Sequence, residues 1–421
     1  MKHKFYFLLV TALMFSSANV FTQWTVVSNS VKSLNSVAVK QGIWGFAVGD
    51  SGVIRKTVTG GTTWNIQNYS TLSSFRKTMI FNSDLAFVCG DSGIVIKTTN
   101  GGSIWQNISP VGTFNFYDMD FLDLNTGIVV GQQRHFAYTP NAGVNWITGQ
   151  LNVPGPANLD YTCVDFIDAN TSFVASKDTL IAGNYTVYIH KSTNNGVSYS
   201  QVFSYSSTQH CPFIDLQFLN ANTGYAAAKN GNLFKTTNGG VNWSTYNITS
   251  AYDVNSIFFY NVNTGYACGS NGYLSKSTNG GVNWLSQNSP ITTTLNDNFF
   301  SDTLKGCSVG KSSMIFTSNG GTFTGFNPNG SEIPGTFRLY QNYPNPFNPV
   351  TKISFDIPLQ SFTRLSIFNI LGEEVSVVLN EVIPGGKYEA EFDASGLPSG
   401  TYFYMLNSGE YTETRKMILI K

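Results

Sequence analysis

Three aspartates, Asp118, Asp215 and Asp297, occupy equivalent places in a segment that recurs along the chain. Seven apolar stretches of the chain can be aligned on the last large residue of each. The three aspartates then all fall in the column three positions before that residue. That column contains only polar or small residues: Ser36, Thr78, Asp118, Cys163, Asp215, Ser256 and Asp297. Carboxylates gathered around one axis can bind a cation or polarise a sugar. A solvated polar lining is the alternative, and it is the interpretation that we favour.

The next position of the same stretches has a different character. It reads Val37, Met79, Met119, Val164, Leu216, Ile257 and Asn298, and most of these residues are apolar. Because successive residues of a strand face opposite sides, we expect this second column to point into a core. Asp120 and Asp165 lie one strand period from the first column and would share its side.

A second motif, Thr/Ser-x-Asn/Thr-x-Gly-x-x-aromatic, marks the elements that carry these columns. Its aromatic residues are Trp64, Trp105, Trp146, Tyr199, Trp243 and Trp284, which are 41, 41, 53, 44 and 41 residues apart. A period of 40 to 45 residues is typical of four-stranded propeller blades. Asn and Gly suit the tight turns between the strands, and the aromatic residue is expected to pack between blades.

Seven inner strands align on Val39, Phe81, Phe121, Phe166, Phe218, Phe259 and Phe300, so the sequence predicts seven blades. The segment Trp24–Val27 is similar to the strands that follow each aromatic residue, yet it precedes the first blade. We expect it to complete the last blade and close the ring, which would hide the sheet edges. The predicted fold is therefore all-β.

The repeats resemble the Asp-box (BNR) propellers, and among them the Ycf48-like repeat proteins, over roughly Trp24 to Phe326. This resemblance implies a β-propeller but specifies little about activity. The chain departs from the family by placing Asn or Thr where the box usually has Asp, which argues against a classical sialidase. Ycf48-like proteins assist photosystem II assembly, a role that we do not transfer because the C-terminal segment indicates another destination.

From Phe337 onward the chain changes character. It begins with the segment Gln341–Pro349, and apolar stretches then alternate at Lys352–Ile357, Arg364–Phe368, Tyr388–Phe392, Tyr402–Leu406 and Lys416–Ile420. These period-2 patterns predict a small immunoglobulin-like β-sandwich. Residues 337–421 resemble the type A C-terminal sorting domain of the type IX secretion system, through Gln341–Pro349, Leu371-Gly372-Glu373, Leu397–Tyr402 and Lys416-Met417. The resemblance implies recognition by the type IX secretion machinery; an ordinary adhesive sandwich is the alternative.

Composition supports this division and excludes some partners. Glutamate is absent from residues 1–331, and all eight lie between Glu332 and Glu413. With 24 basic and 24 acidic residues, the chain lacks the basic excess that nucleic-acid binding requires. Lys2 and Lys4, an apolar run and small residues predict a signal peptide over residues 1–23, with no transmembrane segment in the mature chain. The expected domains are residues 1–23, a propeller over 24–331 and the sorting domain over 332–421.

A second candidate site lies on one face of the predicted propeller. The longest repeat carries its extra residues at Asn152–Pro156 and Ser176–Tyr188, and the next connection spans Val202–Cys211. These segments emerge on the same side of a four-stranded meander, and loops on a rigid scaffold often carry function. The face would present Asp160, Tyr161, Asp178, Tyr185, Tyr188, Tyr205 and His210. This mixture suits carbohydrate or peptide recognition, although it is also ordinary loop composition.

Two functions follow from these features. The first is a secreted or cell-surface binding or scaffold propeller, exported through the periplasm, whose ligand is an extracellular glycan or protein. The second is an Asp-based glycoside hydrolase. A sialidase would need an acid beside its tyrosine and an arginine cluster, whereas the propeller has no Glu and only Arg55, Arg76 and Arg134. We favour binding, and we expect no catalytic residue, metal or cofactor, because the histidines lack ligand spacing.

Overall fold

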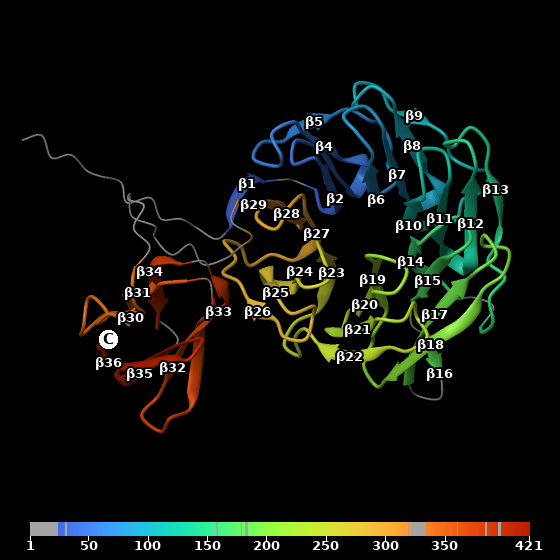
Figure 1. Ribbon diagram of the computed structural model, residues 1–421. Helices are drawn as coiled ribbons and strands as arrows, with labels where there is room; N and C mark the ends of the chain where they lie inside the picture. The colour runs from blue at the N-terminus through green and yellow to red at the C-terminus, as the bar shows by residue number, and fades with distance from the viewer. Residues whose placement is uncertain are drawn as a thin grey trace, which may run out of the picture.

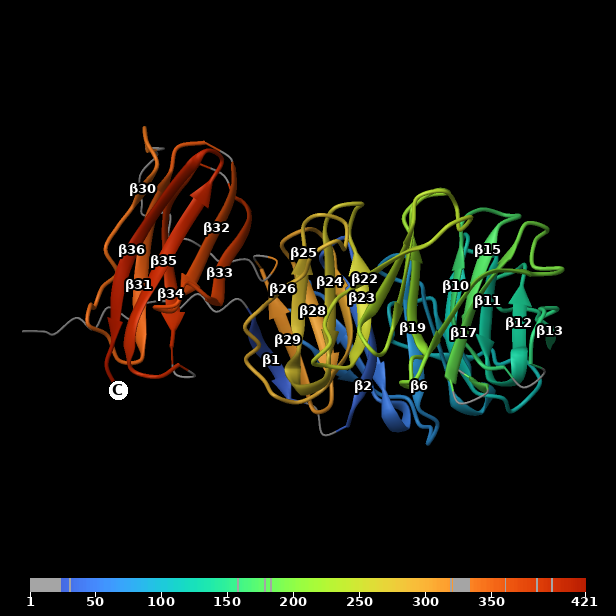
Figure 2. The ribbon, with the colours of Figure 1, turned by 90° about the horizontal axis from the view of Figure 1, so that it is seen from below.

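The computed structural model describes residues 24–29, 32–156, 159–177, 179–181, 184–318, 320, 334–359, 361–383, 385–394 and 397–421. Seven antiparallel sheets surround a common centre, and a smaller pair of sheets follows them in the chain (Figures 1 and 2). The fold is all-β, a seven-bladed propeller followed by a sandwich. The predicted signal peptide and the predicted boundary at Ser331 lie outside the described residues.

Five blades are four-stranded meanders in sequence order, whereas in blade 4 strand β17 pairs with β15, β16 and β18, and blade 7 takes its outer strand from β1. Blade 1 contains β2 (Leu34–Lys40), β3 (Trp44–Gly49), β4 (Ile54–Thr57) and β5 (Asn65–Gln67). Blade 2 contains β6 (Phe75–Ile80), β7 (Ala86–Gly90), β8 (Val95–Thr98) and β9 (Gln106–Asn107). Blade 3 contains β10 (Phe116–Phe121), β11 (Gly127–Gly131), β12 (His135–Thr139) and β13 (Ile147–Gln150). Blade 4 contains β14 (Tyr161–Phe166), β15 (Ser172–Ser176), β16 (Thr179–Ile181), β17 (Asn184–Ser192) and β18 (Ser200–Ser207).

The remaining blades repeat the pattern. Blade 5 contains β19 (Phe213–Phe218), β20 (Gly224–Ala228), β21 (Asn232–Thr236) and β22 (Ser244–Asn247). Blade 6 contains β23 (Val254–Phe259), β24 (Gly265–Gly269), β25 (Leu274–Ser277) and β26 (Leu285–Ser286). Blade 7 contains β27 (Leu295–Phe300), β28 (Gly306–Gly310), β29 (Ser313–Thr317) and β1 (Thr25–Asn29). Single 3-10 turns lie at η1 (Asp50–Gly52), η2 (Asp91–Gly93), η3 (Gln132–Arg134) and η4 (Ser270–Gly272).

The hydrophobic core of the ring lies between the blades. The second strand of blades 2 to 7 is buried at every residue, because a neighbouring blade covers each of its faces. Such strands lose the alternation of apolar and polar residues and become continuous apolar runs. Seven buried clusters each join two adjacent blades. In one of them, the Phe87 ring of blade 2 stacks on Phe121 of blade 3, with centroids 4.3 Å apart.

The ring closes as the sequence predicts. Strand β1 pairs antiparallel with β29, with Thr25 opposite Phe316. Trp24 is buried, its ring lies edge-on to Phe300, and its indole N–H donates to Gln287 Oε1 of blade 6 at 2.9 Å. The strand nearest the N-terminus therefore supplies the outer strand of the last blade, and the ring keeps no open inner edge.

The repeated motif forms the turn between the third and fourth strands. In blade 2, Thr98 Oγ1 accepts the Gly102 N–H at 2.8 Å, and Asn100 Oδ1 accepts the Ile104 N–H at 2.9 Å. The same pair of bonds recurs in the motifs of blades 3 to 6. An amide oxygen thus supplies the acceptor that a carboxylate would provide. The aromatic residue packs between blades, as Trp105 does against Phe46 of blade 1.

Blade 2 corrects the predicted alignment by one residue. Ile80, not Phe81, ends β6 and pairs with Ala86, in the place that phenylalanine takes in most blades. The prediction that Thr78 belongs to the first column is therefore wrong, and Lys77 occupies that place. The error arises because two large apolar residues are adjacent here, and the second one lies just beyond the strand with its ring against neighbouring aromatic rings.

The C-terminal module consists of two sheets over one core. The first contains β30 (Arg338–Leu339), β31 (Val350–Ile357) and β34 (Gly386–Asp393). The second contains β33 (Glu374–Ile383), β32 (Ser361–Phe368), β35 (Gly400–Ser408) and β36 (Tyr411–Leu419). The entry segment is fixed to this core, because Asn342 is buried and its N–H donates to Tyr404 Oη at 2.8 Å.

Candidate functional site

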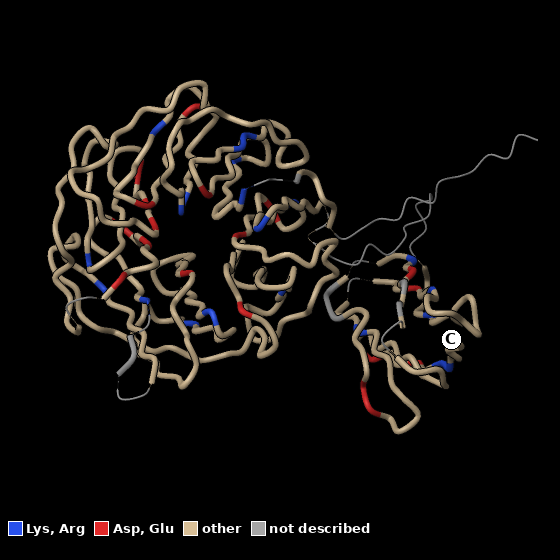
Figure 3. Tube along the Cα trace, turned by 180° about the vertical axis from the view of Figure 1, so that it is seen from behind, with Lys and Arg blue, Asp and Glu red and all other residues tan. Residues whose placement is uncertain are grey.

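The first column lies on the inner strands of the blades, and Figure 3 shows acidic and basic positions along the inner edge of the ring. It carries seven residues, one from the inner strand of each blade: Ser36, Lys77, Asp118, Cys163, Asp215, Ser256 and Asp297. A bulge lies beside this position in every blade, because the residue immediately before it has no partner on the second strand. The predicted carboxylates therefore do share one axis.

Each of the three column carboxylates accepts a hydrogen bond from the backbone of the following blade. Asp118 Oδ2 accepts the Val164 N–H at 2.8 Å. Asp215 Oδ2 accepts the Ile257 N–H at 3.1 Å. Asp297 Oδ2 accepts the Val37 N–H at 2.8 Å and so joins blade 7 to blade 1. We refer to Asp118, Asp215 and Asp297 as the inter-blade carboxylates.

A second layer of the inner strands uses the same device. Asp120 Oδ2 accepts the Phe166 N–H at 2.7 Å, and Asp165 Oδ2 accepts the N–H of Phe218. Gln217 Oε1 accepts the Phe259 N–H at 2.7 Å, although its side chain is neutral. Since an amide performs the same task, the function of this layer is to accept a backbone hydrogen bond rather than to supply charge.

Lys77 balances part of the negative charge at the axis. Its Nζ lies 3.4 Å from Asp118 Oδ1, and the Asp118 charge raises the pKa of Lys77 well above its ordinary value. Asp215 and Asp297 raise that pKa further from other blades. For Asp118 itself, burial raises the pKa more than Lys77 lowers it. Sequence reasoning missed Lys77, although it lies 41 residues after Ser36 and 41 before Asp118.

Burial dominates the titration of the other acids at the axis. It raises the pKa of Asp215 and of Asp120 to about 6. Burial and the charge of Asp120 raise the pKa of Asp165 well above its ordinary value. Ser256 Oγ lies 3.1 Å from Asp215 Oδ2 and 2.9 Å from Asp297 Oδ1. Its single hydroxyl proton can serve only one of these carboxylates, so a proton on Asp215 would satisfy the other contact.

The contacts of the inter-blade carboxylates bear on the alternative of a glycoside hydrolase. A glycosidase needs one carboxyl that protonates the leaving oxygen and a second that attacks or activates water. Here each inter-blade carboxylate already accepts a backbone N–H from the next strand. Within the described residues, no group of three His, Cys, Asp or Glu side chains could hold a metal ion.

The predicted loop residues Asp160 and Tyr161 also have partners inside the fold. Asp160 Oδ1 accepts the Gln133 N–H at 2.9 Å and thereby caps η3 of blade 3. Tyr161 is fully buried, and its hydroxyl lies 3.0 Å from His190 Nδ1. The face therefore does not present Tyr161, contrary to expectation. Burial lowers the pKa of His190 to about 4, so the ring is neutral near pH 7.

The other predicted loop residues are spread along blade 4 and its border. Tyr185 and Tyr188 are half-buried on β17, and the exposed His210 lies edge-on to Tyr185 at 5.4 Å. Tyr205 Oη accepts from Asn232 Nδ2 of blade 5 at 2.9 Å. The predicted connection at Val202–Cys211 is mostly strand, because β18 extends to Ser207. Asp178 lies outside the described residues.

The propeller arginines do not form a cluster. Arg76 pairs with Asp91 of its own blade at 2.6 Å. Arg134 donates to the backbone oxygens of Val153 and Pro156, at 3.1 and 3.0 Å, and so holds the connection into blade 4. These two arginines are therefore engaged by the fold, whereas Arg55 on β4 has a buried Nε without a hydrogen-bond partner.

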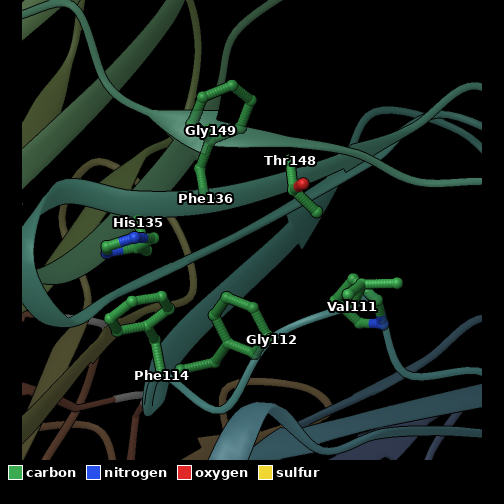
Figure 4. A pocket seen from close by; sticks show the side chains of 9 residues that line it. Val111, Gly112, Phe114, His135, Phe136, Thr148 and Gly149 are labelled. Atoms are coloured by element: carbon green, nitrogen blue, oxygen red, sulfur yellow. The ribbon is translucent and has the colours of Figure 1, made fainter.

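A pocket of about 220 Å³ opens in blade 3, at a place that the sequence did not suggest. Figure 4 shows the stacked rings of Phe114 and His135 at one end and Val111 at the other. The full lining is Pro110, Val111, Gly112, Phe114, Phe116, His135, Phe136, Thr148 and Gly149. It belongs to the same face as the predicted loops, because connections between blades and turns after second strands build it.

Two family models match parts of the chain. Residues 341–421 match the secretion system C-terminal sorting domain, and residues 16–112 match the photosynthesis system II assembly factor YCF48. The photosystem II assembly lipoprotein Ycf48 of Synechococcus sp. (strain CC9902) is 26% identical over 129 residues, which span 31% of this chain and 36% of that protein. The chain thus carries a C-terminal sorting domain and Ycf48-like repeats.

Solved structures show the same propeller fold. A YCF48 bound to D1 peptide has a TM-score of 0.56 at 15% identity, covering 71% of this chain and 97% of that one. The YCF48 from Cyanidioschyzon merolae has a TM-score of 0.57 at 17% identity, covering 70% and 98%. The sorting domain supports secretion to the cell surface or the extracellular space. Among the described residues, no helix is long and apolar enough to cross a membrane.

Proposed function

We propose that the protein is an extracellular binding or scaffold propeller, exported by the type IX secretion system through residues 337–421. The observation that carries this proposal is the engagement of all three inter-blade carboxylates with backbone N–H groups of the next blade. The groups that resembled catalytic acids hold the ring together, and a rigid ring is a suitable support for binding loops.

The match to a sorting domain supports the export step. In this proposal a signal peptide over residues 1–23 delivers the chain to the periplasm, and residues 332–421 form the sorting domain. The outer-membrane machinery then recognises the sandwich. The mature propeller, residues 24–331, acts at the cell surface or after release.

The ligand in this proposal is a protein or a carbohydrate bound on the face that carries the blade 3 pocket and the blade 4 loops. Tyr185, Tyr188, Tyr205 and His210 are the remaining predicted binding residues on that face. A scaffold role is compatible with the likeness to Ycf48 proteins, one of which has been solved with a bound peptide.

A panel experiment tests the function. Purified full chain is exposed to immobilised polysaccharides and extracellular proteins, and retained binding and released products are scored together. We expect saturable binding to one ligand class without products. Products that disappear in Asp118→Asn, Asp215→Asn or Asp297→Asn would instead establish the glycoside hydrolase.

A further inference from the structure

The blade 3 pocket has a glycine, Gly149, in its wall beside the Phe136 ring. Gly149 is the third residue after the aromatic residue of the repeated motif. In five other blades this place holds a side chain: Gln67, Ile108, Val202, Tyr246 and Gln287. A Cβ atom at Gly149 would lie 3.2 Å from the Phe136 ring, tighter than ordinary contact. A branched side chain here would press on the Phe136 ring, which also lines the pocket.

Two stacked rings give the pocket a firm end wall. The Phe114 and His135 rings are nearly parallel, with an interplanar angle of 16° and centroids 3.3 Å apart. His135 Nδ1 lies 3.0 Å from the carbonyl oxygen of Gln132, which can only accept. In the neutral ring Nδ1 therefore carries the proton, and Nε2 keeps a lone pair that can accept a hydrogen bond.

The lining chemistry restricts the occupant. Besides His135, Thr148 is the one lining residue with a polar side chain, and no lining residue is an acid, Lys or Arg. A pyranose carries several hydroxyl groups, and burying them without partners would cost free energy. A volume of about 220 Å³ is also below the 300–1,000 Å³ typical of whole small-molecule sites. These features favour one large apolar group with a single polar atom.

We propose that this pocket binds an aromatic side chain, tyrosine best of all, from an extended segment of a protein partner. The phenol ring would lie against the Phe114 and Phe136 side chains, and its hydroxyl would donate to an acceptor such as His135 Nε2. Val111 is 96% exposed at the rim, so a bound segment would cover it. The inference rests on the proposed binding function and makes the ligand class a protein.

The full chain contains four histidines, which permits a direct test with ¹³C-labelled histidine. The probe is N-acetyl-L-tyrosinamide, observed by the imidazole signals, with that of His135 assigned from His135→Gln. We expect a saturable shift of the His135 signal and no shift of His190 or His210. N-acetyl-L-leucinamide should bind more weakly, and methyl β-D-glucoside should leave the signal unchanged.

Gly149→Val adds a branched side chain to the pocket wall beside Phe136 and should weaken the tyrosinamide response at least tenfold. Gly149 lies in strand β13 and outside the left-handed region, so valine suits its backbone. Gln67→Val places the same residue at the equivalent position of blade 1 and should bind as the wild type does. An equal response in Gly149→Val, a stronger response to the glucoside, or no response at the probe's solubility limit would each overturn the inference.

The panel experiment separates this inference from the proposed function. If the full chain binds a polymer and Gly149→Val binds it equally well, the pocket assignment is wrong and the binding function stands. If the His135 signal shifts while the panel shows turnover, the pocket assignment stands and the binding function is wrong.

Discussion

At the scale of single residues, the acids near the axis accept backbone hydrogen bonds from the neighbouring blade. A buried backbone N–H without a partner costs about 1–3 kcal/mol, so each inter-blade carboxylate removes a penalty from the following strand. The acids also differ in titration, because burial raises the pKa of Asp215 to about 6 while exposed Asp168 has a lowered pKa from two backbone N–H donors. The pKa of an aspartate in this protein therefore depends on its burial and on its hydrogen-bond donors.

The raised pKa of Asp215 predicts a pH effect of definite sign. Its folded value, about 6, exceeds the ordinary value of 3.8, so the folded chain holds the proton more tightly. This contribution to stability is complete below about pH 4 and is lost as the pH rises through 6. Between pH 5 and 7, we expect the free energy of unfolding to fall by about 1 kcal/mol more in the wild type than in Asp215→Asn.

Urea unfolding followed by tryptophan fluorescence measures this difference. Asp253→Asn, at an exposed carboxyl, is the matched control and should keep the wild-type slope. The variants must be compared with one another, because the lowered pKa of His190 gives the opposite slope. Its contribution is present above pH 6.5 and is lost as the pH falls through about 4. Equal slopes in wild type and Asp215→Asn would contradict the prediction.

At the scale of elements, a lysine on the third strand ties neighbouring blades. Lys235 Nζ donates to the Gly280 carbonyl of blade 6 at 3.0 Å and lies 5.4 Å above the Tyr225 ring. Lys97 of blade 2 and Lys191 of blade 4 likewise donate to a carbonyl of the next blade and lie above an aromatic ring of their own blade. The lysine before the motif and the aromatic residue on the second strand therefore belong to one repeated device.

Replacing this lysine by methionine keeps the aliphatic stem and removes the charge. We expect Lys235→Met to lower the free energy of unfolding by about 1–2 kcal/mol, because it loses a charge-assisted hydrogen bond and a cation–π contact. Chemical denaturation measures the loss. Lys305→Met, at an exposed turn lysine, should change stability by less than about 0.5 kcal/mol. An equal loss of unfolding free energy in the two variants would show that the contact of Lys235 with blade 6 does not stabilise the fold.

Sequence predicted the repeated elements well because their signals are local. The aromatic period indicated propeller blades, the seven aligned inner strands gave their number, and the likeness of Trp24–Val27 to outer strands gave the closure. The register of blade 2 was missed because Ile80 and Phe81 are both large and apolar. The 41-residue spacing that Lys77 keeps from Ser36 and from Asp118 would have chosen between them. The chain also contains β33, which the apolar alternation did not indicate.

The candidate site was less predictable, since its roles depend on distant partners. The column of carboxylates was found, but the amide that binds Asp118 is 46 residues away and the one that binds Asp297 is 260 residues away. No local pattern encodes such pairs. The blade 3 pocket has Gly149 in its wall, a position that draws attention only when the blades are superposed.

At the scale of the whole molecule, the chain consists of two modules, the propeller and the sandwich. The propeller has its cores between blades, whereas the sandwich has one core of its own. The matched sorting domain supports secretion, and the propeller supplies the surface that remains to interact. Charge follows the same division, because every glutamate lies in or just before the sandwich.

Removal of residues 337–421 tests the role of the sandwich. In a host with a type IX secretion system, we expect the full chain at the cell surface or in the medium and the truncated chain in the periplasm. Cell fractionation with antibody detection gives the distribution. A truncated chain that still reaches the medium in full amount would contradict a sorting role, while protease resistance would show that its propeller is folded.

If the acids at the axis join blades rather than perform chemistry, their removal should loosen the following strand, and hydrogen exchange measures this effect. In Asp215→Ala, the Ile257 N–H loses its acceptor, so the inner strand Val254–Phe259 should exchange about tenfold faster. The inner strand Phe75–Ile80 of blade 2 should be unchanged. Unchanged exchange in Val254–Phe259, together with loss of binding or turnover, would contradict the claim and make Asp215 a functional group.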